Sequence, residues 1–206
     1  MLQNGGDCAM PRNNIILQSK QAFIDALFHL MENETYDDVT IKQLVLGSGY
    51  SRRTYYRYFS SKTAILNESF SQNMESYHKH LEQQKKLDPE NIPAQFINFM
   101  WPLHHRLQLL AQNDLLIPLL AKNVPDIAKM LLMIKVPWRQ AQQPDLNKYY
   151  YALIYSIGGF CVMLDTIFKE PTLKEPKDII DSLSSALMEI TANINERNDH
   201  IDASEV

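Results

Sequence analysis

The sequence predicts an all-α protein with a small N-terminal domain of three helices and a larger C-terminal helical domain. Apolar residues recur at helical spacing through almost the whole chain, and polar residues stand where helix N-caps are expected. No run of alternating β-branched residues bounded by hairpin turns is present in the sequence. The 206 residues, of which 45% are hydrophobic, suffice for two helical domains.

Residues 39–62 predict two short helices joined by a tight turn. Thr40 and Gln43 have the spacing of a capping box, in which each side chain bonds a free backbone N–H of the first helical turn. The turn falls at residues 47–50, Gly-Ser-Gly-Tyr, because glycine accepts the positive φ that a sharp corner requires. Ser51 then stands at the N-cap position of the second helix. Together these signals predict a helix-turn-helix motif.

The same stretch is basic, although the whole chain has a net charge of -4. Phosphate oxygens are the natural partner of such a local cationic surface. A helix fits the major groove of B-DNA, where arginine can bond guanine and tyrosine can contact phosphate or a thymine methyl group. A helical hairpin with a solvated basic face is the alternative, and the cap and turn signals favour DNA binding over it. The stretch contains no acidic residue, and its basic residues are Lys42, Arg52, Arg53, Arg57 and Lys62.

Three segments of this region resemble the TetR/AcrR family of DNA-binding regulators. They are Phe23-Ile24-Asp25-Ala26-Leu27, Tyr36 followed by Val39-Thr40-Ile41, and the run Gly-Tyr-Ser-Arg-Arg-Thr-Tyr-Tyr-Arg-Tyr-Phe-Ser-Ser-Lys at 49–62. The resemblance implies a helix-turn-helix domain over residues 15–70, with its motif at 40–59. It also implies a C-terminal ligand-binding and dimerisation domain over residues 71–196. Polar, flexible tails are expected at 1–14 and 197–206.

Two sets of DNA contacts are predicted for this domain. Phosphate contacts set the position of a protein on the duplex, whereas base contacts set its sequence preference. The side chains expected to reach bases or nearby phosphates are Arg53, Thr54, Tyr56 and Tyr58. The side chains expected on phosphates are Thr40, Lys42, Arg52, Arg57 and Lys62.

The remaining helices follow from apolar periodicity and from breaks at proline and polar runs. Pro102 is expected to kink the helix that contains it, because proline removes one backbone hydrogen bond and crowds the preceding turn. Residues 138–144 are predicted to form a loop. The predicted helices are Ser19–Met31, Ser61–Lys86, Pro93–Gln112, Leu115–Lys122, Pro125–Val136, Asp145–Lys169 and Pro176–Glu196.

One interpretation of the helix kinked at Pro102 is that its aromatic and histidine side chains line a ligand cavity. A bent core helix without a cavity is the alternative, and it is the interpretation that we favour for this helix taken alone. Methionine is flexible and suits pockets that accept varied apolar ligands. The effector compatible with these side chains is small and apolar or aromatic. Its predicted pocket consists of Phe96, Met100, Trp101, His104, Met130, Tyr155 and Met163.

The uncharged run from Tyr149 to Leu164 predicts a buried or interface helix, because it is shorter than the ~20 apolar residues of a membrane span. Gly158 and Gly159 each weaken a helix by about 1 kcal/mol relative to alanine, which suggests that another helix backbone approaches them closely. The end of the chain resembles the TetR/AcrR branch that contains the activator of dihydroxyacetone kinase genes. In the family, the last two helices pair with those of a second subunit. This resemblance implies a homodimer interface that includes Gly158, Gly159, Leu183, Leu187 and Ile190.

The predicted function is a sequence-specific, DNA-binding transcription regulator, and specifically a repressor that a small-molecule effector releases. The alternative is a protein-binding co-regulator that keeps the fold without binding an operator by itself. We predict no enzyme, cofactor or metal, since the sequence contains no nucleophile elbow, phosphate-binding glycine loop or strong metal-ligand spacing. Cys8 and Cys161 lie far apart in the sequence, so we expect no disulfide framework. The predicted location is therefore a reducing bacterial cytosol. The expected partners are operator DNA and a second copy of the chain, with no membrane.

Overall fold

The computed structural model describes residues 12–84, 91–133, 146–186 and 189. Within these ranges the protein is all-α and has no strand, which confirms the predicted fold class. Most of both predicted tails, the loop predicted at 138–144 and the positions Leu187 and Ile190 lie outside the described residues. The elements are α1 (Arg12–Met31), α2 (Ile41–Ser48), α3 (Arg52–Tyr58), α4 (Lys62–Glu82), α5 (Ile92–Met100), the 3-10 turn η2 (Trp101–Leu103), α6 (His104–Gln112), α7 (Leu116–Met133) and α8 (Leu146–Phe168), and residues 176–186 are also helical.

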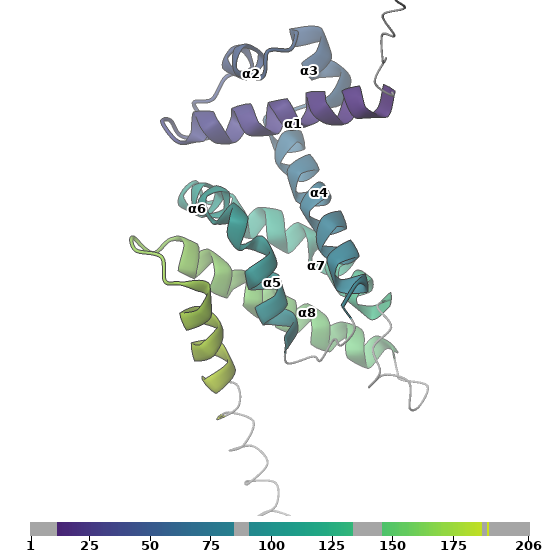
Figure 1. Cartoon of the computed structure of the whole chain (residues 1–206), viewed down its shortest axis with the longest axis vertical. Helices are drawn as coiled ribbons and strands as arrows, with labels where there is room; N and C mark the ends of the chain where they lie inside the picture. Colours follow the sequence, from purple (N-terminus) through teal and green to yellow (C-terminus); the bar gives the residue numbers. More distant parts are fainter. Residues whose placement is uncertain (1–11, 85–90, 134–145, 187–188, 190–206) are drawn as a thin grey trace, which may run out of the picture.

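Helix α4 joins two parts of the molecule, as Figure 1 shows. The head consists of α1, α2 and α3, and the body consists of α5 to α8. Helix α4 begins in the head directly after α3 and runs into the body, where Met74, Tyr77 and Leu81 are buried. One apolar core cluster contains both Phe23 of α1 and Phe168 of α8. The head and the body are therefore packed against each other, and the boundary predicted at residue 70 falls inside α4.

Side-chain caps begin the helices around the turn, as predicted. The Thr40 backbone N–H donates to Gln43 Oε1 over 2.8 Å, and the Gln43 backbone N–H donates to Thr40 Oγ1 over 3.3 Å, so both halves of the capping box are present. Ser51 Oγ accepts from the Thr54 backbone N–H at the start of α3, and Ser61 Oγ accepts from Ala64 at the start of α4. Each cap supplies a partner to a backbone N–H that the helix leaves free, which typically stabilises a helix by about 1 kcal/mol.

The two turn glycines have different roles. Gly49 ends α2 with φ of 72°, the left-handed conformation that glycine adopts without steric cost. Gly47 lies inside the last turn of α2, and a Cβ built on it would come within 3.3 Å of the Ala26 Cβ. Gly49 therefore makes the corner, whereas Gly47 allows α2 to approach α1 closely. The sequence predicted the corner without separating these two roles.

An aromatic cluster fixes α3 on α1. Phe23 is fully buried, and its ring centroid lies 5.6 Å from that of Tyr55 and 5.8 Å from that of Phe59, both in edge-on geometry. Tyr55 and Phe59 are four residues apart and thus lie on the same side of the chain. Because this side is held in the core, the opposite side of α3 faces solvent.

Proline has a different effect at its two internal positions in the body. At Pro102 the predicted kink is confirmed as a full interruption, because η2 separates α5 from α6. At Pro125 the expected boundary between two helices is wrong, since α7 continues through this residue to Met133. Proline leaves one backbone carbonyl of the preceding turn unpaired, and both Pro125 and Ala121 are exposed, so water can bond that carbonyl.

Helix α1 is longer than the sequence predicts, because it begins at Arg12 rather than at Ser19. Ser19 is buried, and its hydroxyl donates to the backbone carbonyls of Ile15 and Ile16 at 2.9 Å each. A serine in a helix interior can satisfy its hydroxyl in this way, so it need not begin the helix. The last residues of the predicted tail, 12–14, are accordingly helical.

Candidate nucleic-acid interface and effector cavity

The outer side of α3 is cationic and exposed. Arg52, Arg53 and Arg57 are exposed on this helix, and Lys42 is exposed on α2. Within the part of the chain that the structure describes, Arg53, Arg57 and Lys42 make no hydrogen bond or ion pair. Their charges are therefore not neutralised by the described part of the chain, and the aromatic cluster beneath holds α3 in place. This arrangement suits an anionic surface that approaches from solvent.

Arg52 and Tyr56 lie one helical turn apart on α3 and touch. An Arg52 guanidinium nitrogen donates to the Tyr56 hydroxyl over 3.4 Å, and its Cζ lies 5.7 Å from the Tyr56 ring centroid. The hydrogen bond is long, and Tyr56 remains 52% exposed, so the pair can rearrange when a ligand arrives. The Tyr56 ring also lies edge-on against the buried Tyr55 at 5.1 Å, which limits where it can move.

Three of the other predicted DNA-contacting residues are partly engaged within the protein. Thr54 is half-buried, and its hydroxyl lies 2.9 Å from the Ser51 hydroxyl. Tyr58 is half-buried against the core cluster. Thr40 is exposed, but its hydroxyl oxygen caps α2. The structure thus places Arg53, Tyr56 and Arg57 on the open side of α3, with Thr54 and Tyr58 closer to the core.

Lys62 is bound within the protein, contrary to the free phosphate-binding side chain that the sequence suggests. Its ammonium donates to the backbone carbonyls of Tyr36 (2.6 Å), Asp37 (3.0 Å) and Val39 (2.7 Å). It also lies 4.7 Å from the centroid of the Tyr36 ring. An ammonium group has three donors, so all three are used. Lys62 therefore ties the start of α4, directly after α3, to the loop that precedes α2.

Asn113 joins the head to the body at the end of α6. Its side-chain oxygen accepts from the Tyr36 backbone N–H over 2.8 Å, and its side-chain nitrogen donates to the Leu109 carbonyl over 2.8 Å. Tyr36 is the same residue whose carbonyl and ring contact Lys62. Sequence reasoning missed Asn113, because its only local signal is a polar break after an apolar helix.

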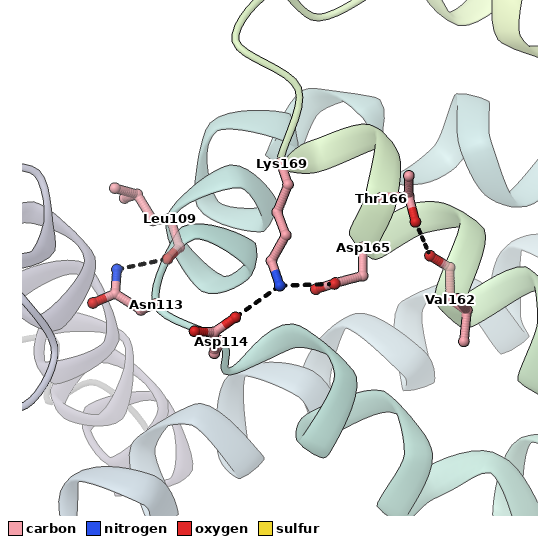
Figure 2. Close-up of polar contacts among 7 residues, drawn as sticks. All are labelled: Leu109, Asn113, Asp114, Val162, Asp165, Thr166 and Lys169. Atoms are coloured by element: carbon pink, nitrogen blue, oxygen red, sulfur yellow. Dashed lines mark hydrogen bonds and ion pairs between the residues drawn. The ribbon is translucent and has the colours of Figure 1, made fainter.

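The next residue, Asp114, joins the loop between α6 and α7 to the end of α8, as Figure 2 shows. The Lys169 ammonium lies 2.7 Å from Asp114 Oδ1 and 3.1 Å from Asp165 Oδ2. The hydrogen bonds with Asp114 and Asp165 raise the pKa of Lys169. Asp114 has φ of 55°, a left-handed conformation that Asp tolerates better than most residues. The α6–α7 loop thus contacts the head through Asn113 and the end of α8 through Asp114.

An apolar cavity of about 40 Å³, called the central cavity below, lies inside the molecule. Its wall includes residues of α4, α5, α6, α7 and α8, together with Phe28 from α1 of the head. A second, smaller cavity of about 10 Å³ shares Phe96, Met100, Leu107 and two residues of α8 with the first. One side of the wall therefore belongs to the head, and the rest belongs to α4 and the body.

The structure brings three of the predicted pocket residues to these cavities. Phe96 and Met100 line both cavities, and Trp101 lines the smaller one. His104 lies outside the wall, where its ring stacks on Trp101 at 5.4 Å and its Nδ1 lies 2.9 Å from the Trp101 carbonyl oxygen. Its position is that of a side chain that supports the η2 turn.

The other three predicted pocket residues lie elsewhere. Met130 packs against a separate core cluster that includes Tyr77 and Leu81. Met163 lines an open groove of about 270 Å³ between α8 and the helix of residues 176–186, together with Leu183. Tyr155 is 84% exposed and lines none of these spaces. Helical spacing alone did not reveal which side of α8 faces the core.

One side of α8 is apolar and has no covering within the described chain. Tyr151, Tyr155 and Val162 are 70%, 84% and 58% exposed, and their spacing places them on one helix face with Gly159. A Cβ built on Gly158 or Gly159 would meet no atom within 4 Å. The two glycines therefore have no close packing partner inside the described chain. An exposed apolar face of this kind is typical of a protein–protein contact.

Residues Tyr150–Phe168 of α8 have the length and apolar composition of a membrane-crossing helix, with a mean hydropathy of 1.6. The sequence had suggested that the apolar run was too short for this. Only 22% of this stretch is buried. Its packed side nonetheless belongs to the body, since Cys161, Leu164 and Phe168 are buried in the core. Burial raises the pKa of the Cys161 thiol to about 11.

The head is a helix-turn-helix domain whose second helix presents a cationic, solvent-facing side. Residues 23–69 match the family model described as bacterial regulatory proteins, tetR family. The head is therefore a TetR-family N-terminal domain, as the sequence resemblance implied.

Two solved structures share the fold over most of their length. Lin0861 from Listeria innocua has a TM-score of 0.60 and 13% sequence identity, covering 86% of this chain and 93% of its own. A TetR transcriptional regulator from Streptococcus agalactiae 2603V has a TM-score of 0.51 and 16% sequence identity. The match covers 84% of this chain and 96% of that regulator. A comparison with curated protein sequences gave no match. At these identities the solved structures show the fold alone, and they do not identify the branch of the family that the C-terminal sequence suggested.

Proposed function

We propose that the protein is a sequence-specific DNA-binding transcription regulator that acts as a homodimer. The observation that carries this proposal is the outer side of α3, where Arg53 and Arg57 are exposed and make no bond to the described chain. The aromatic cluster beneath α3 and the Ser51 cap at its start fix the orientation of the helix that carries these side chains. A short, rigid, cationic helix in a TetR-family head fits the major groove of B-DNA.

The exposed face of α8 supports the homodimer. Two copies of Tyr155 and Gly159 that face each other would cover apolar surface and let the two helix backbones come close. Leu183, half-buried on the adjacent helix, can extend the contact. A two-fold dimer would present two α3 helices, and these would read half-sites one helical turn of DNA apart, about 34 Å.

Within this proposal, Arg53, Tyr56 and Arg57 reach base edges or nearby phosphates, and Lys42 and Arg52 bind phosphate. Thr40, Thr54 and Tyr58 make auxiliary contacts at the edge of the interface, because each is partly engaged by its own domain. We move Lys62 from the phosphate-binding set to a supporting role, since its ammonium already bonds three carbonyls.

We further propose that the protein is a repressor in the bacterial cytosol and that a small effector in the central cavity releases it from DNA. The cavity wall supports this idea, because it contains Phe28 of the head as well as body residues. A ligand there would contact both the head and the body of one subunit. It would thereby favour a different spacing of the two heads in the dimer. It can do so only if it binds the DNA-free arrangement more tightly than the DNA-bound one.

The decisive experiment measures binding to the DNA upstream of the gene for this chain by fluorescence anisotropy, against a scrambled duplex. We expect Arg53→Ala to lower the ratio of specific to non-specific affinity by about ten- to hundredfold, because a bidentate arginine–guanine contact discriminates by about 1–3 kcal/mol. Lys122→Ala is the matched control, since Lys122 is exposed on α7 of the body. An unchanged ratio for Arg53→Ala would remove its base-reading role, and no preference in the wild type would overturn sequence-specific binding to this DNA.

The alternative of a co-regulator that binds only proteins is not favoured. Such a protein would have no use for an exposed basic helix whose charges are unpaired in the described chain. A wild-type chain that fails to bind any duplex at low salt, where electrostatic contacts are strongest, would restore this alternative. We also propose no catalytic activity.

A further inference from the structure

The central cavity has one charged residue in its wall, Arg106 of α6. The other polar lining residues are Ser69 and Asn73, which lie four residues apart on the same side of α4. Neither makes a side-chain hydrogen bond within the described ranges. The rest of the wall is aliphatic, aromatic or thioether. Besides its apolar residues, the wall therefore contains an arginine, a serine and an asparagine, whose side chains can all donate hydrogen bonds.

Arg106 also connects the cavity to the head. A guanidinium nitrogen lies 2.7 Å from Asp25 Oδ1, and its Cζ lies 4.9 Å from the ring centroid of Phe28. Asp25 and Phe28 both belong to α1, and Phe28 lines the cavity. The Arg106 side chain is 31% exposed and that of Asp25 is 52% exposed. An ion pair so open to solvent is weak, so another anion can compete for the guanidinium.

We propose that this cavity binds a small monocarboxylate with an apolar body, whose carboxylate accepts hydrogen bonds from Arg106 in competition with Asp25. The inference rests on the proposed function only in that this ligand would be the effector. A carboxylate suits Arg106, because a planar guanidinium binds it with two parallel hydrogen bonds. A cationic ligand would be repelled by Arg106, and a neutral alcohol would gain no charge-assisted bond.

The size of the cavity restricts the ligand. About 40 Å³ corresponds to about three water molecules, since one water needs roughly 10–15 Å³ measured in this way. A short chain or a single ring is therefore the largest apolar body that fits with modest movement. Met74 and Met100 in the wall provide that movement, because methionine side chains repack easily. We choose hexanoate as the probe for this class.

Because Arg106 of α6 bonds Asp25 of α1, a ligand that binds Arg106 also changes how the body holds the head. When the ligand carboxylate takes the guanidinium, the direct link from α6 to Asp25 of α1 is lost. The ligand then stabilises an arrangement in which the head is less firmly held to the body. Because the ligand and Asp25 compete, anything that removes the Asp25 charge should tighten ligand binding.

Isothermal titration calorimetry on the full chain without DNA tests the inference, using hexanoate, 1-hexanol and hexylamine as probes. We expect the wild type to bind hexanoate at least tenfold more tightly than hexanol, since a hydrogen bond to a charged group typically changes affinity by tenfold or more. Hexylamine should bind most weakly, because Arg106 repels its charge. Arg106→Met should reduce hexanoate binding to the level of hexanol. Asp25→Asn should tighten hexanoate binding several-fold.

Equal affinity for hexanoate and hexanol in the wild type would overturn the proposal, as would a carboxylate preference that survives in Arg106→Met. Should Arg106→Met fail to fold, Asp25→Asn decides, because an unchanged hexanoate affinity contradicts the competition. Leu107→Trp should abolish hexanoate binding by filling the cavity, and undiminished binding would place the ligand elsewhere and refute the site.

A separate anisotropy assay asks whether hexanoate lowers the affinity of the wild type for its DNA but not that of Arg106→Met. Calorimetry requires no DNA, so a failure of operator binding would count against the proposed function and leave the calorimetric test of the ligand site intact. Conversely, DNA binding that is insensitive to hexanoate, alongside a confirmed calorimetric preference, would refute only its role as effector.

Discussion

Replacing Lys62 with methionine separates two possible roles of this residue. The substitution keeps most of the apolar stem and removes the ammonium, which bonds the carbonyls of Tyr36, Asp37 and Val39 at 2.6–3.0 Å. A hydrogen bond to a charged group contributes about 1.5–3 kcal/mol, but the three bonds share one charge and water can replace part of them. We therefore expect a loss of about 2–4 kcal/mol in the free energy of unfolding.

Thermal unfolding followed by circular dichroism measures this loss. In a chain of this size each kcal/mol corresponds to about 2–4 °C, so Lys62→Met should lower Tm by roughly 4–16 °C. The salt dependence of DNA binding should keep the wild-type slope when measured well below Tm, because Lys62 does not neutralise a phosphate. Lys42→Met is the matched control, since Lys42 is exposed on α2 and has no partner within the described chain.

The control should behave in the opposite way. Lys42→Met should leave Tm almost unchanged and flatten the plot of log affinity against log salt by about 0.9, the effect of one phosphate contact. If Lys62→Met instead left Tm unchanged and flattened this slope, Lys62 would bind phosphate as the sequence first suggested, and the supporting role inferred from the three carbonyls would be wrong.

The remaining predictions concern the core, the dimer and the thiol. Tyr55→Phe should leave stability unchanged or raise it by up to about 1 kcal/mol in urea unfolding, because the buried Tyr55 hydroxyl has no partner within the described residues; a clear loss would reveal a partner that the hydroxyl does bond. Tyr155→Asp should convert the proposed dimer to a monomer in analytical ultracentrifugation without unfolding it, since Tyr155 is 84% exposed, and a dimer that persists in the variant would exclude this face of α8. Cys161 should resist alkylation at pH 8, because burial shields the thiol and raises its pKa to about 11, and rapid labelling of its peptide in the native protein would contradict this environment.

Local signals predicted the head well because its geometry is set by short-range chemistry. The capping box of Thr40 and Gln43 and the positive φ of Gly49 each depend on residues within a few positions. The basic outer side of α3 was also predictable, since Tyr55 and Phe59 are the apolar residues that must face inward. Its exposure followed directly from that periodicity.

The body was predicted less well because its apolar residues are too numerous to define one face. Met130, Tyr155 and Met163 were assigned to one pocket by residue type, yet they lie in a separate core cluster, on an exposed face and in an open groove. Pro125 looked like a helix boundary, but α7 passes through it with the proline exposed. Such choices depend on which neighbours cover each side of a helix, and a linear pattern does not contain that information.

The sequence by itself determined that the chain is helical, where the helix-turn-helix begins and turns, and which side of α3 is cationic, because caps, glycine conformation and helical periodicity are local properties. The tertiary structure alone decided that Lys62 bonds a distant loop, that Asn113 joins the head to the body and that Arg106 lies in the wall of an apolar cavity beside Asp25. These groups are separated by 23 to 81 positions in the chain, so their chemistry is set by which helices pack together.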